Sequence, residues 1–581
     1  MLLDGLANTV AEAAGAPPDQ IKVILLLVGA VPLSILFPYF PSTARSSRAH
    51  LYAFLPTVLF LCFILDLRWG FLQLLGSTLA TWVLVKIGVA LNWGRAMPWL
   101  VFTVVMGHLG VNHVLNFIDK SRMENFEIST VQMVLCMKLI SFAWSCYDGQ
   151  RPEAELDANQ KGSRIEGVPG LLPFLGYAFF FPSILAGPAN TYRSYIAFTS
   201  HALFSKENPT SSSAPPDPTV IPPGRRRKAL KRFLTGIVFL GIYSVYGGQL
   251  GMAKLLDKQW LAEHGFWARL AHMNVAGFVA RTKYYAVWCL AESAFIISGL
   301  GYNPLTRHYD ASRNVRIRSI ELAPNFKVLL DSWNMNTNVW LRECIYKRVA
   351  KKGRKPGFKS TQITFITSAL WHGVNPCYLM TFVLGGFCQA LNRSLRAGLR
   401  PFFLPPGALS VPNPAAAPIT APDVKVDKAA APAGKVKIAA PPQTPAKTLY
   451  DILGTVATLV VLNFAVVPFL LLDVPSSLAA WRAVHYYGLV LVFVPFTLLN
   501  LLGGLRYIKA AQKKRDACAG AGGKKASKEE QEQERKRVEW ERNEEEKRKR
   551  RGEGFASMGL DVEEMVEREE RQGRKNARKE L

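Results

Sequence analysis

The sequence has few cysteines, and no two of them stand in a spacing that suggests a shared role. The eight cysteines are scattered through 581 residues, and no CxxC motif occurs. A disulfide framework and a cysteine zinc site are therefore not expected, and we predict no bound metal. The chain also lacks a GxSxG nucleophile elbow, an HExxH motif, a Walker A loop and an HxxxxD motif. These absences leave serine-hydrolase, zinc-peptidase and P-loop chemistry without a sequence signature.

Acidic residues are scarce relative to basic ones. The chain has 43 Asp and Glu residues against 70 Lys and Arg residues, which gives a formal net charge of +27. No recognisable nucleic-acid-binding module is present, so we expect no nucleic-acid partner. In a membrane protein, the same excess is explained by the positive-inside rule and by attraction to anionic lipid headgroups.

Long apolar runs dominate what the chain does contain. A helical run of about 20 apolar residues crosses the hydrocarbon core of a lipid bilayer. Candidate runs occur at 21–40, 51–66, 69–92, 97–118, 130–147, 168–188, 233–256, 274–300, 361–392, 449–472 and 485–506. We therefore predict an all-α polytopic membrane protein with about eleven membrane helices.

Composition divides the chain into four parts. Residues 1–400 and 448–506 hold the apolar runs and are predicted to form one membrane domain. Between them, residues 401–447 are rich in Pro and Ala and poor in large apolar residues, which predicts a disordered or semi-rigid linker. Residues 507–581 carry dense charge of both signs, which favours a solvated tail.

Polar and ionisable side chains inside apolar runs are costly, so each is a candidate functional residue. His108, Asn112 and Asn116 recur at every fourth position and form one polar stripe on a helix. Other apolar runs contain Lys138, Asp148, Glu292 and His372. The alternative for the stripe and for the first three of these is interhelical hydrogen bonding, or snorkelling to the membrane surface.

His372 has surroundings that the other polar residues lack. It lies in SALWHGVNPCYLMTF (368–382), between Trp371 and Gly373. A histidine in a dry, aromatic setting stays neutral, and a neutral imidazole can act as a general base towards an alcohol. We predict that His372 is catalytic and that Trp371 and Gly373 contact the substrate.

A second polar block, SWNMNTNVWLRECIYKRV, precedes it at 332–349. Uncharged hydrogen-bonding groups among aromatic rings suit the binding of a polar substrate group at the bilayer interface. Asn334 is the best candidate for a donor to an oxyanion or to the acceptor, and we predict that it is catalytic. The predicted substrate-binding residues of this block are Trp333, Asn336, Thr337, Trp340 and Tyr346. Glu292, from the run at 274–300, is predicted to join them.

A cationic run lies between the two blocks. The stretch from Arg342 to Lys359 holds eight Lys and Arg residues and one acidic residue, Glu343. Acyl-CoA combines phosphates, which such a run attracts, with an acyl chain that membrane helices accept. Attraction to its phosphates is predicted for Lys351, Lys352, Arg354 and Lys355. Direct transfer from acyl-CoA as co-substrate needs no further cofactor.

The sequence resembles the membrane-bound O-acyltransferase (MBOAT) family, and within it the lysophospholipid acyltransferases of fungi. The two blocks above carry the resemblance, and so do four further segments. These are QMVLCMKLISFAWSCYDG (132–149), FLGYAFFFPSILAGP (174–188), RTKYYAVWCLAESAFIISGLGYN (281–303) and LNFAVVPFLLLD (462–473). The resemblance implies an intramembrane reaction chamber, with His372 and Asn334 at the positions of the family's histidine and asparagine. It also implies that acyl-CoA enters from the cytosol and a lysophospholipid from the bilayer.

The resemblance further implies the endoplasmic reticulum membrane, and basic residues after the last apolar run predict a cytosolic tail. Within the family, acylation of a sterol, a diacylglycerol or a protein is the alternative. A transporter that relays protons through intramembrane His, Lys and Glu residues is the alternative from another class. The lack of detectable inverted repeats argues against a transporter. The oligomeric state is left open.

Overall fold

The computed structural model describes residues 3–40, 47–119, 127–204, 221–350, 357–405, 444–522 and 539. Within these ranges the chain is helical, and its only strand-like pairing is an isolated bridge between Asn303 and His308. The contacts divide the chain into two compact units. The first comprises Met1–Ala350, Pro356–Arg393 and Asp451–Leu498, and the second Lys351–Lys355, Ser394–Tyr450 and Leu499–Leu581. Both blocks of predicted site residues belong to the first unit.

Seven helices in the described ranges are long and apolar enough to cross a membrane. They are α2 (Pro18–Ser34, extended to Tyr39 by a 3-10 turn), α3 (Ser47–Val58, extended to Ile64 by a π-helical turn), α4 (Arg68–Ala90), α5 (Ala96–Ile118), α6 (Ile128–Gly149), α11 (Arg225–Tyr246) and α19 (Pro445–Ala465). An eighth span results if α21 (Val474–Ala483) and the helix from Tyr487 to Leu501, bent by 86°, count as one. The multi-pass membrane architecture is confirmed, but the predicted count of eleven spans is not.

Three predicted spans differ from the helices observed. The run 168–188 forms two short helices, α8 (Leu171–Ala178) and α9 (Phe181–Ile184), because the chain breaks ahead of Pro182. The run 361–392 divides into α17 (Phe358–His372) and α18 (Pro376–Gly398). The run 274–300 belongs to α13 (Phe266–Ser298), which is long enough to cross a membrane but is not among the helices that are also apolar enough.

The remaining helices are shorter or more polar. They are α1 (Asp4–Ala14), α7 (Ala158–Ser163), α10 (Tyr192–Thr199), α12 (Lys258–Glu263), α14 (Ile317–Glu321), α15 (Phe326–Ser332), α16 (Met335–Leu341), α20 (Val467–Leu471), α22 (Tyr487–Phe496) and α23 (Gly504–Gly522). Helix α16 continues as a π-helical turn at Arg342–Tyr346, and α22 as one at Thr497–Leu501. Helix α19 begins at Pro445, so the last residues of the range predicted as linker are helical, while 406–443 lie outside the described residues.

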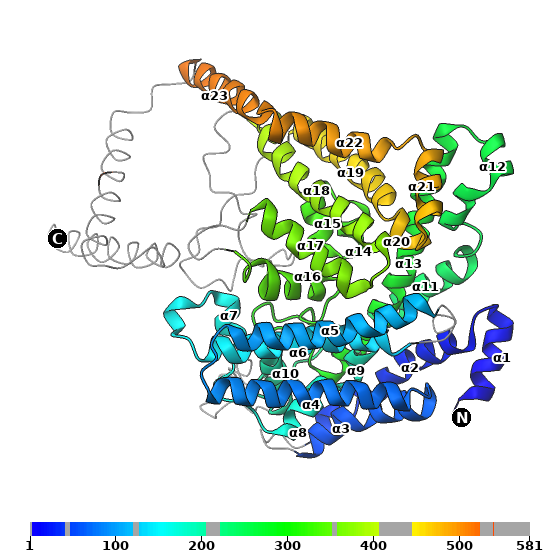
Figure 1. Ribbon diagram of the computed structural model, residues 1–581, viewed down its shortest axis with the longest axis vertical. Helices are drawn as coiled ribbons and strands as arrows, with labels where there is room; N and C mark the ends of the chain where they lie inside the picture. Colours follow the sequence, from blue (N-terminus) through cyan, green and yellow to red (C-terminus); the bar gives the residue numbers. More distant parts are fainter. Residues whose placement is uncertain are drawn as a thin grey trace. The chain divides into compact units, whose positions relative to one another are not determined.

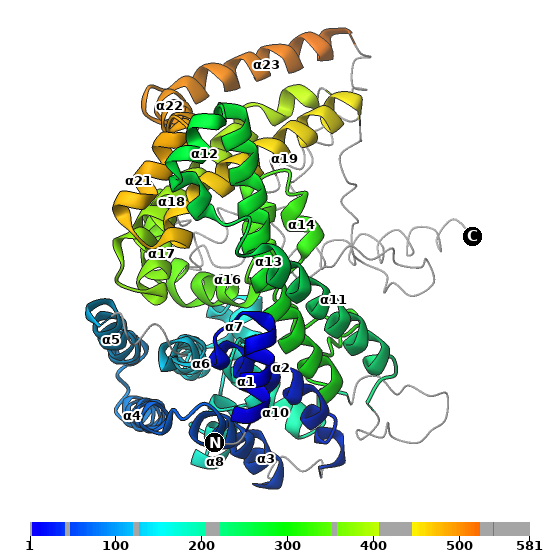
Figure 2. The same ribbon diagram turned by 90° about the vertical axis from the view of Figure 1, so that its right-hand side faces the viewer.

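Two sets of long helices form the frame of the first unit. Helices α4, α5 and α6 pack side by side (Figure 1). Helices α11 and α13 pack along each other (Figure 2). Their contacts show that they are antiparallel: Arg232 of α11 pairs with Glu292 of α13, and Tyr243, later in α11, contacts Lys283, earlier in α13. Glycine at 236 permits this close approach, since a Cβ there would lie 2.9 Å from the Leu290 side chain. Close packing through small residues is a common way for membrane helices to associate.

The polar stripe of α5 makes hydrogen bonds between helices. His108 bonds to Ser77 of α4, and the amide of Asn112 donates to Gln132 of α6 at 2.7 Å. Lys138 of α6 is fully buried and donates to the Ala178 carbonyl at 3.1 Å and to Ser183 at 3.0 Å. These residues hold helices together, in agreement with the alternative that the sequence left open.

A buried ion pair joins α6 to the end of the second polar block. Asp148 accepts two hydrogen bonds from Arg348, at 2.8 and 2.5 Å, and the guanidinium lies 4.2 Å from the centre of the Trp144 ring. Both side chains are nearly inaccessible, at 2% and 8% exposed. Removing one partner of such a pair leaves an uncompensated buried charge, which is far more costly than losing an exposed pair.

We therefore predict that Asp148→Ala destabilises the protein strongly, by roughly 3–5 kcal/mol. The matched control is Glu155→Ala, because Glu155 is half exposed and bonds to Arg151 at 3.1 Å, so its loss should cost less than about 1 kcal/mol. The measurement is the thermal unfolding midpoint of each variant in detergent. Equal shifts for both variants would show that the Asp148 pair is not a structural anchor.

Candidate active site

Helix α17 ends at His372 because the backbone of Gly373 adopts a non-helical conformation. Gly373 has a φ of +154°, which L side chains rarely adopt, and its N–H closes the last turn on the Ala369 carbonyl. A Cβ at position 373 would also lie only 2.6 Å from the Tyr378 ring. The next helix starts at Pro376. The glycine therefore presents the preceding histidine at the end of a helix, against the first turn of α18.

Aromatic rings from three helices surround the His372 imidazole. Tyr378 and Phe382 of α18 stack on it, with ring centres 5.8 and 5.0 Å away. Phe469 of α20 meets it edge-on at 5.1 Å, and Trp371 does so at 4.7 Å. The imidazole is half-buried, and within the described ranges neither ring nitrogen makes a hydrogen bond. It is therefore held by ring packing alone and keeps a nitrogen available.

Trp371 fixes the end of α17 to α5 and α6. Its indole N–H donates to the Met133 carbonyl of α6 at 2.9 Å. Its own carbonyl lies 3.1 Å from Nε2 of His113 on α5, so that nitrogen carries a proton and donates it. Trp371 also packs on Trp340, with ring centres 5.9 Å apart. Two hydrogen bonds and one ring contact thus locate the residue directly before His372.

Asn334 lies at the start of α16 in a left-handed conformation, with a φ of +42°. Asparagine is among the few residues other than glycine that tolerate this conformation. Its Oδ1 accepts hydrogen bonds from the Thr337 hydroxyl at 2.8 Å and from Nδ2 of Asn314 at 3.2 Å. Because both bonds go to the oxygen, the Nδ2 group of the half-buried Asn334 remains as a free donor in the described part of the chain.

Helix α6 brings the two blocks to one place. Trp371, next to His372, bonds to Met133, and Thr337, which holds Asn334, has its hydroxyl 3.2 Å from the Met137 sulfur. Met133 and Met137 are one turn apart, and residues so spaced lie about 5–6 Å apart on one helix face. A base with an available nitrogen and an amide donor are therefore positioned from the same turn of α6.

The other predicted residues of the second block take different places. Trp333 packs on α13, with its ring centre 5.6 Å from that of Tyr284 and 5.0 Å from that of Trp288. The Asn336 amide donates to Asn314 at 3.0 Å, and Tyr346 is half-buried in the π-helical turn that follows α16. Trp340 is buried against Trp371, as described above.

Glu292 lies in a separate cluster of charges. Its carboxylate is fully buried and bonds to Arg232 of α11, and Nε of Arg313 is 4.0 Å away. This ion pair connects α11, α13 and the loop that contains Asn314. These contacts give Glu292 structural partners, and its binding of substrate stays a prediction.

Some cations of the run 342–359 are paired with carboxylates that are distant in sequence. Glu343 is its only acidic residue in sequence, but folding brings in two others: Lys347 bonds to Asp157 at 2.7 Å, and Arg348 pairs with Asp148. The four residues predicted to attract phosphate, Lys351, Lys352, Arg354 and Lys355, lie outside the described residues, so this attraction stays a prediction. Two cations assigned to the run are thus structural.

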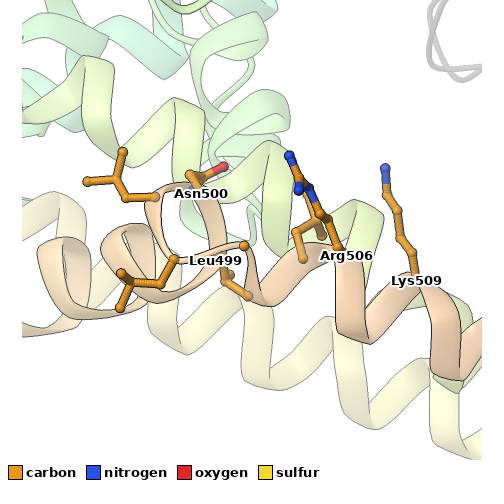
Figure 3. Close-up of a pocket in the computed structure, with 8 residues that line it drawn as sticks. Leu499, Asn500, Arg506 and Lys509 are labelled. Atoms are coloured by element: carbon orange, nitrogen blue, oxygen red, sulfur yellow. The ribbon is translucent and has the colours of Figure 1, made fainter.

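Two further features of the described residues, possible metal-binding clusters and a surface cavity, identify no additional catalytic group. Among the described residues, no group of three or more His, Cys, Asp or Glu side chains could hold a metal ion. A cavity of about 380 Å³ occurs in the second unit, around the junction of the Thr497–Leu501 turn and α23. Arg506 and Lys509 extend from the same side of that helix beside Asn500 (Figure 3). The cavity is lined by no histidine, carboxylate or cysteine, so it carries no candidate catalytic group.

Sequence reasoning missed three contributors to the site. His113 lies directly after Asn112 of the polar stripe and was assigned no role, although it donates a hydrogen bond to the Trp371 carbonyl. Phe469 lies in a quoted family segment without an assigned role, and Asn314 lies in no quoted segment. Nothing in the local pattern around Asn314 distinguishes it from other loop asparagines.

The sequence is similar to known proteins over most of its length. The model of MBOAT, the membrane-bound O-acyltransferase family, matches residues 90–411, which include both polar blocks. The chain is 35% identical over 490 residues to a lysophospholipid acyltransferase of Schizosaccharomyces pombe, covering 84% of this chain and 87% of that protein. It is 31% identical over 512 residues to a lysophospholipid acyltransferase of Saccharomyces cerevisiae, covering 86% and 77%. The human membrane-bound glycerophospholipid O-acyltransferase 2 is 25% identical over 498 residues, covering 83% and 85%.

The helical, multi-pass membrane architecture and the similarity to these proteins define a membrane-embedded O-acyltransferase. The chain belongs to the membrane-bound O-acyltransferase family.

The free Nδ2 group of Asn334 is open to a direct test. Asn334→Asp keeps an oxygen for both accepted hydrogen bonds, so the fold should be retained; it replaces the N–H donor by a second oxygen and adds a negative charge, which the control below adds as well. If that donor stabilises the oxyanion, kcat for acyl transfer should fall by about 10²–10³-fold. Asn338→Asp is the control, because the Asn338 amide bonds to the Leu330 carbonyl and does not contact the Asn334 side chain. A kcat for Asn334→Asp close to that of the control would refute the donor role.

Proposed function

We propose that this protein is an acyl-CoA-dependent lysophospholipid acyltransferase. Its acceptor would be the free glycerol hydroxyl of a lysophospholipid, in phospholipid synthesis and remodelling. The proposal is supported by the names of its two fungal relatives, which cover most of this chain. The observation that carries the chemistry is the His372 imidazole, which has an available nitrogen inside a ring of aromatic side chains.

In the proposed reaction, His372 removes the proton of the acceptor hydroxyl as its oxygen attacks the thioester carbonyl carbon. The new C–O bond forms a tetrahedral intermediate, and its collapse breaks the C–S bond. The departing CoA thiolate takes the proton from the imidazolium, so the base is restored and the products are a phospholipid and CoA. An imidazole packed only by rings can accept a proton without first losing another hydrogen bond.

Asn334 supplies the second element of the proposed reaction. Its Nδ2 would donate to the oxyanion, or hold the acceptor, from the turn of α6 that also positions His372. A donor oriented before the reaction stabilises developing charge without reorganisation, and this effect is usually large in a water-poor site. The aromatic surroundings of His372 favour such a site, because they leave little room for water.

The substrates are proposed to arrive from two directions. Acyl-CoA would approach from the cytosolic side, where Lys351, Lys352, Arg354 and Lys355 would attract its phosphates. The lysophospholipid would enter laterally from the bilayer. In this proposal the enzyme resides in the endoplasmic reticulum membrane with its C-terminal tail in the cytosol.

A transfer assay tests the proposed substrate class. Purified protein in detergent or nanodiscs, given radiolabelled acyl-CoA and a panel of acceptors, should label lysophospholipids and form the corresponding phospholipids. Sterol, diacylglycerol and a peptide in the same panel represent the other acylation reactions of the family. Label in one of these and none in any lysophospholipid would overturn the proposal, and movement of label across a membrane without esterification would indicate a transporter.

The topology is tested separately in sealed microsomes. Lys509, Lys513, Lys514 and Arg515 follow the last apolar run, so the positive-inside rule predicts a cytosolic tail. Protease added outside should remove a tag fused after Leu581 without detergent. A tag that is protected until the membrane is dissolved would contradict the proposed orientation and the route of acyl-CoA to His372.

A further inference from the structure

Two backbone hydrogen bonds join the loop that precedes α14 to the Asn334 segment. The N–H of Met335 donates to the Asn314 carbonyl at 2.8 Å, and the N–H of Arg316 donates to the Ser332 carbonyl at 3.0 Å. Asn314 is therefore held by its backbone opposite the left-handed residue Asn334, and only 2% of the residue is exposed. A buried amide in such a place must use its donors and acceptor within the fold.

The orientation of the Asn314 amide follows from a backbone group. The N–H of Asn336, 3.1 Å away, can only donate, so the atom that faces it must be Oδ1 of Asn314. The Asn336 side-chain amide donates to the same oxygen at 3.0 Å. The Nδ2 group of Asn314 consequently faces Oδ1 of Asn334, at 3.2 Å.

The backbone N–H of Asn336 thus fixes the amide orientation of Asn314, and Asn314 in turn fixes that of Asn334 in the candidate active site. Because Nδ2 of Asn314 donates, the Asn334 atom next to it must be its oxygen, and the Thr337 hydroxyl donates to that same oxygen at 2.8 Å. The Asn334 amide is thereby prevented from rotating by half a turn. A rotated amide would present an oxygen in place of the donor and would repel an oxyanion.

We infer that Asn314 is a positioning residue that locks the Asn334 amide with its Nδ2 donor toward the substrate. The inference rests on the proposed function, since it assigns to Asn314 an effect that acts only through the Asn334 donor. Asn314 lies outside all the sequence segments quoted above for their resemblance to the family.

Asn314→Asp is the sharpest variant. At alkaline pH its carboxylate still accepts both bonds from Asn336 but cannot donate to Asn334, so the Asn334 amide turns to offer its N–H to position 314. We expect kcat to fall by about 10–100-fold with KM changed less than about threefold, the scale of a misplaced catalytic group. Asn338→Asp, the same chemical change in α16 at an amide that bonds to the Leu330 carbonyl, should leave kcat within about twofold.

A double-mutant cycle with Asn334→Ala separates positioning from general destabilisation. In the Asn334→Ala background, Asn314→Asp should cause no further loss of kcat, because the group that it positions is absent. A further loss as large as that in the wild-type background would show a structural role only and would overturn the inference. Wild-type kcat in Asn314→Asp would also overturn it.

Two controls complete the experiment. If Asn314→Asp is not recovered as folded protein, judged by a single size-exclusion peak and by its unfolding midpoint, Asn314→Ala replaces it in the same cycle with the same expected outcomes. Failure of the proposed function has a different signature, because the wild-type protein itself would transfer no acyl group to any lysophospholipid. If the wild-type protein is active and Asn334→Ala alone retains wild-type kcat, the role of Asn334 falls before that of Asn314 is reached.

Discussion

The hydrogen bond from the Trp371 indole to the Met133 carbonyl is the contact on which the arrangement of the site depends. It ties the end of α17 to one turn of α6, and the hydroxyl that holds Asn334 touches the same turn through Met137. Without this shared support, no common helix would position both His372, at the end of α17, and Asn334, in the turn before α16. Rigid elements that carry both groups are what a preorganised site requires. Helix α6 is suited to this role because polar contacts and a buried ion pair fix it to its neighbours.

Much of this could be predicted from the sequence, because some patterns report directly on physics. Long apolar runs predict membrane helices, and the multi-pass helical class followed from them. The WHG tripeptide indicated His372, and its glycine proves to be required by a φ of +154° and by the nearby Tyr378 ring. The predicted count of eleven spans was not confirmed, and hydropathy alone does not show that the run 361–392 is divided into two helices between His372 and Pro376.

Contacts between distant segments could not be predicted in this way. Asp148 and Arg348 are 200 residues apart, so the cationic run looked opposed by Glu343 alone. Asn314 reaches Asn334 from a loop without any motif, and its role depends on which amide atom faces a backbone N–H. Phe469, one of the aromatic side chains that surround His372, follows the predicted linker in the sequence. Local periodicity contains no information on such pairings, whereas the folded backbone fixes them.

The central claim is that His372 is the base of an acyl transfer, and His372→Ala measures it most directly. The variant should be extracted as folded protein with unchanged affinity for acyl-CoA, since the imidazole makes no hydrogen bond in the described ranges, while its unfolding midpoint should fall because four ring contacts are lost. Single-turnover transfer from bound acyl-CoA to a lysophospholipid should fall by at least about 10²-fold. Transfer at a near wild-type rate by folded variant protein would contradict the account.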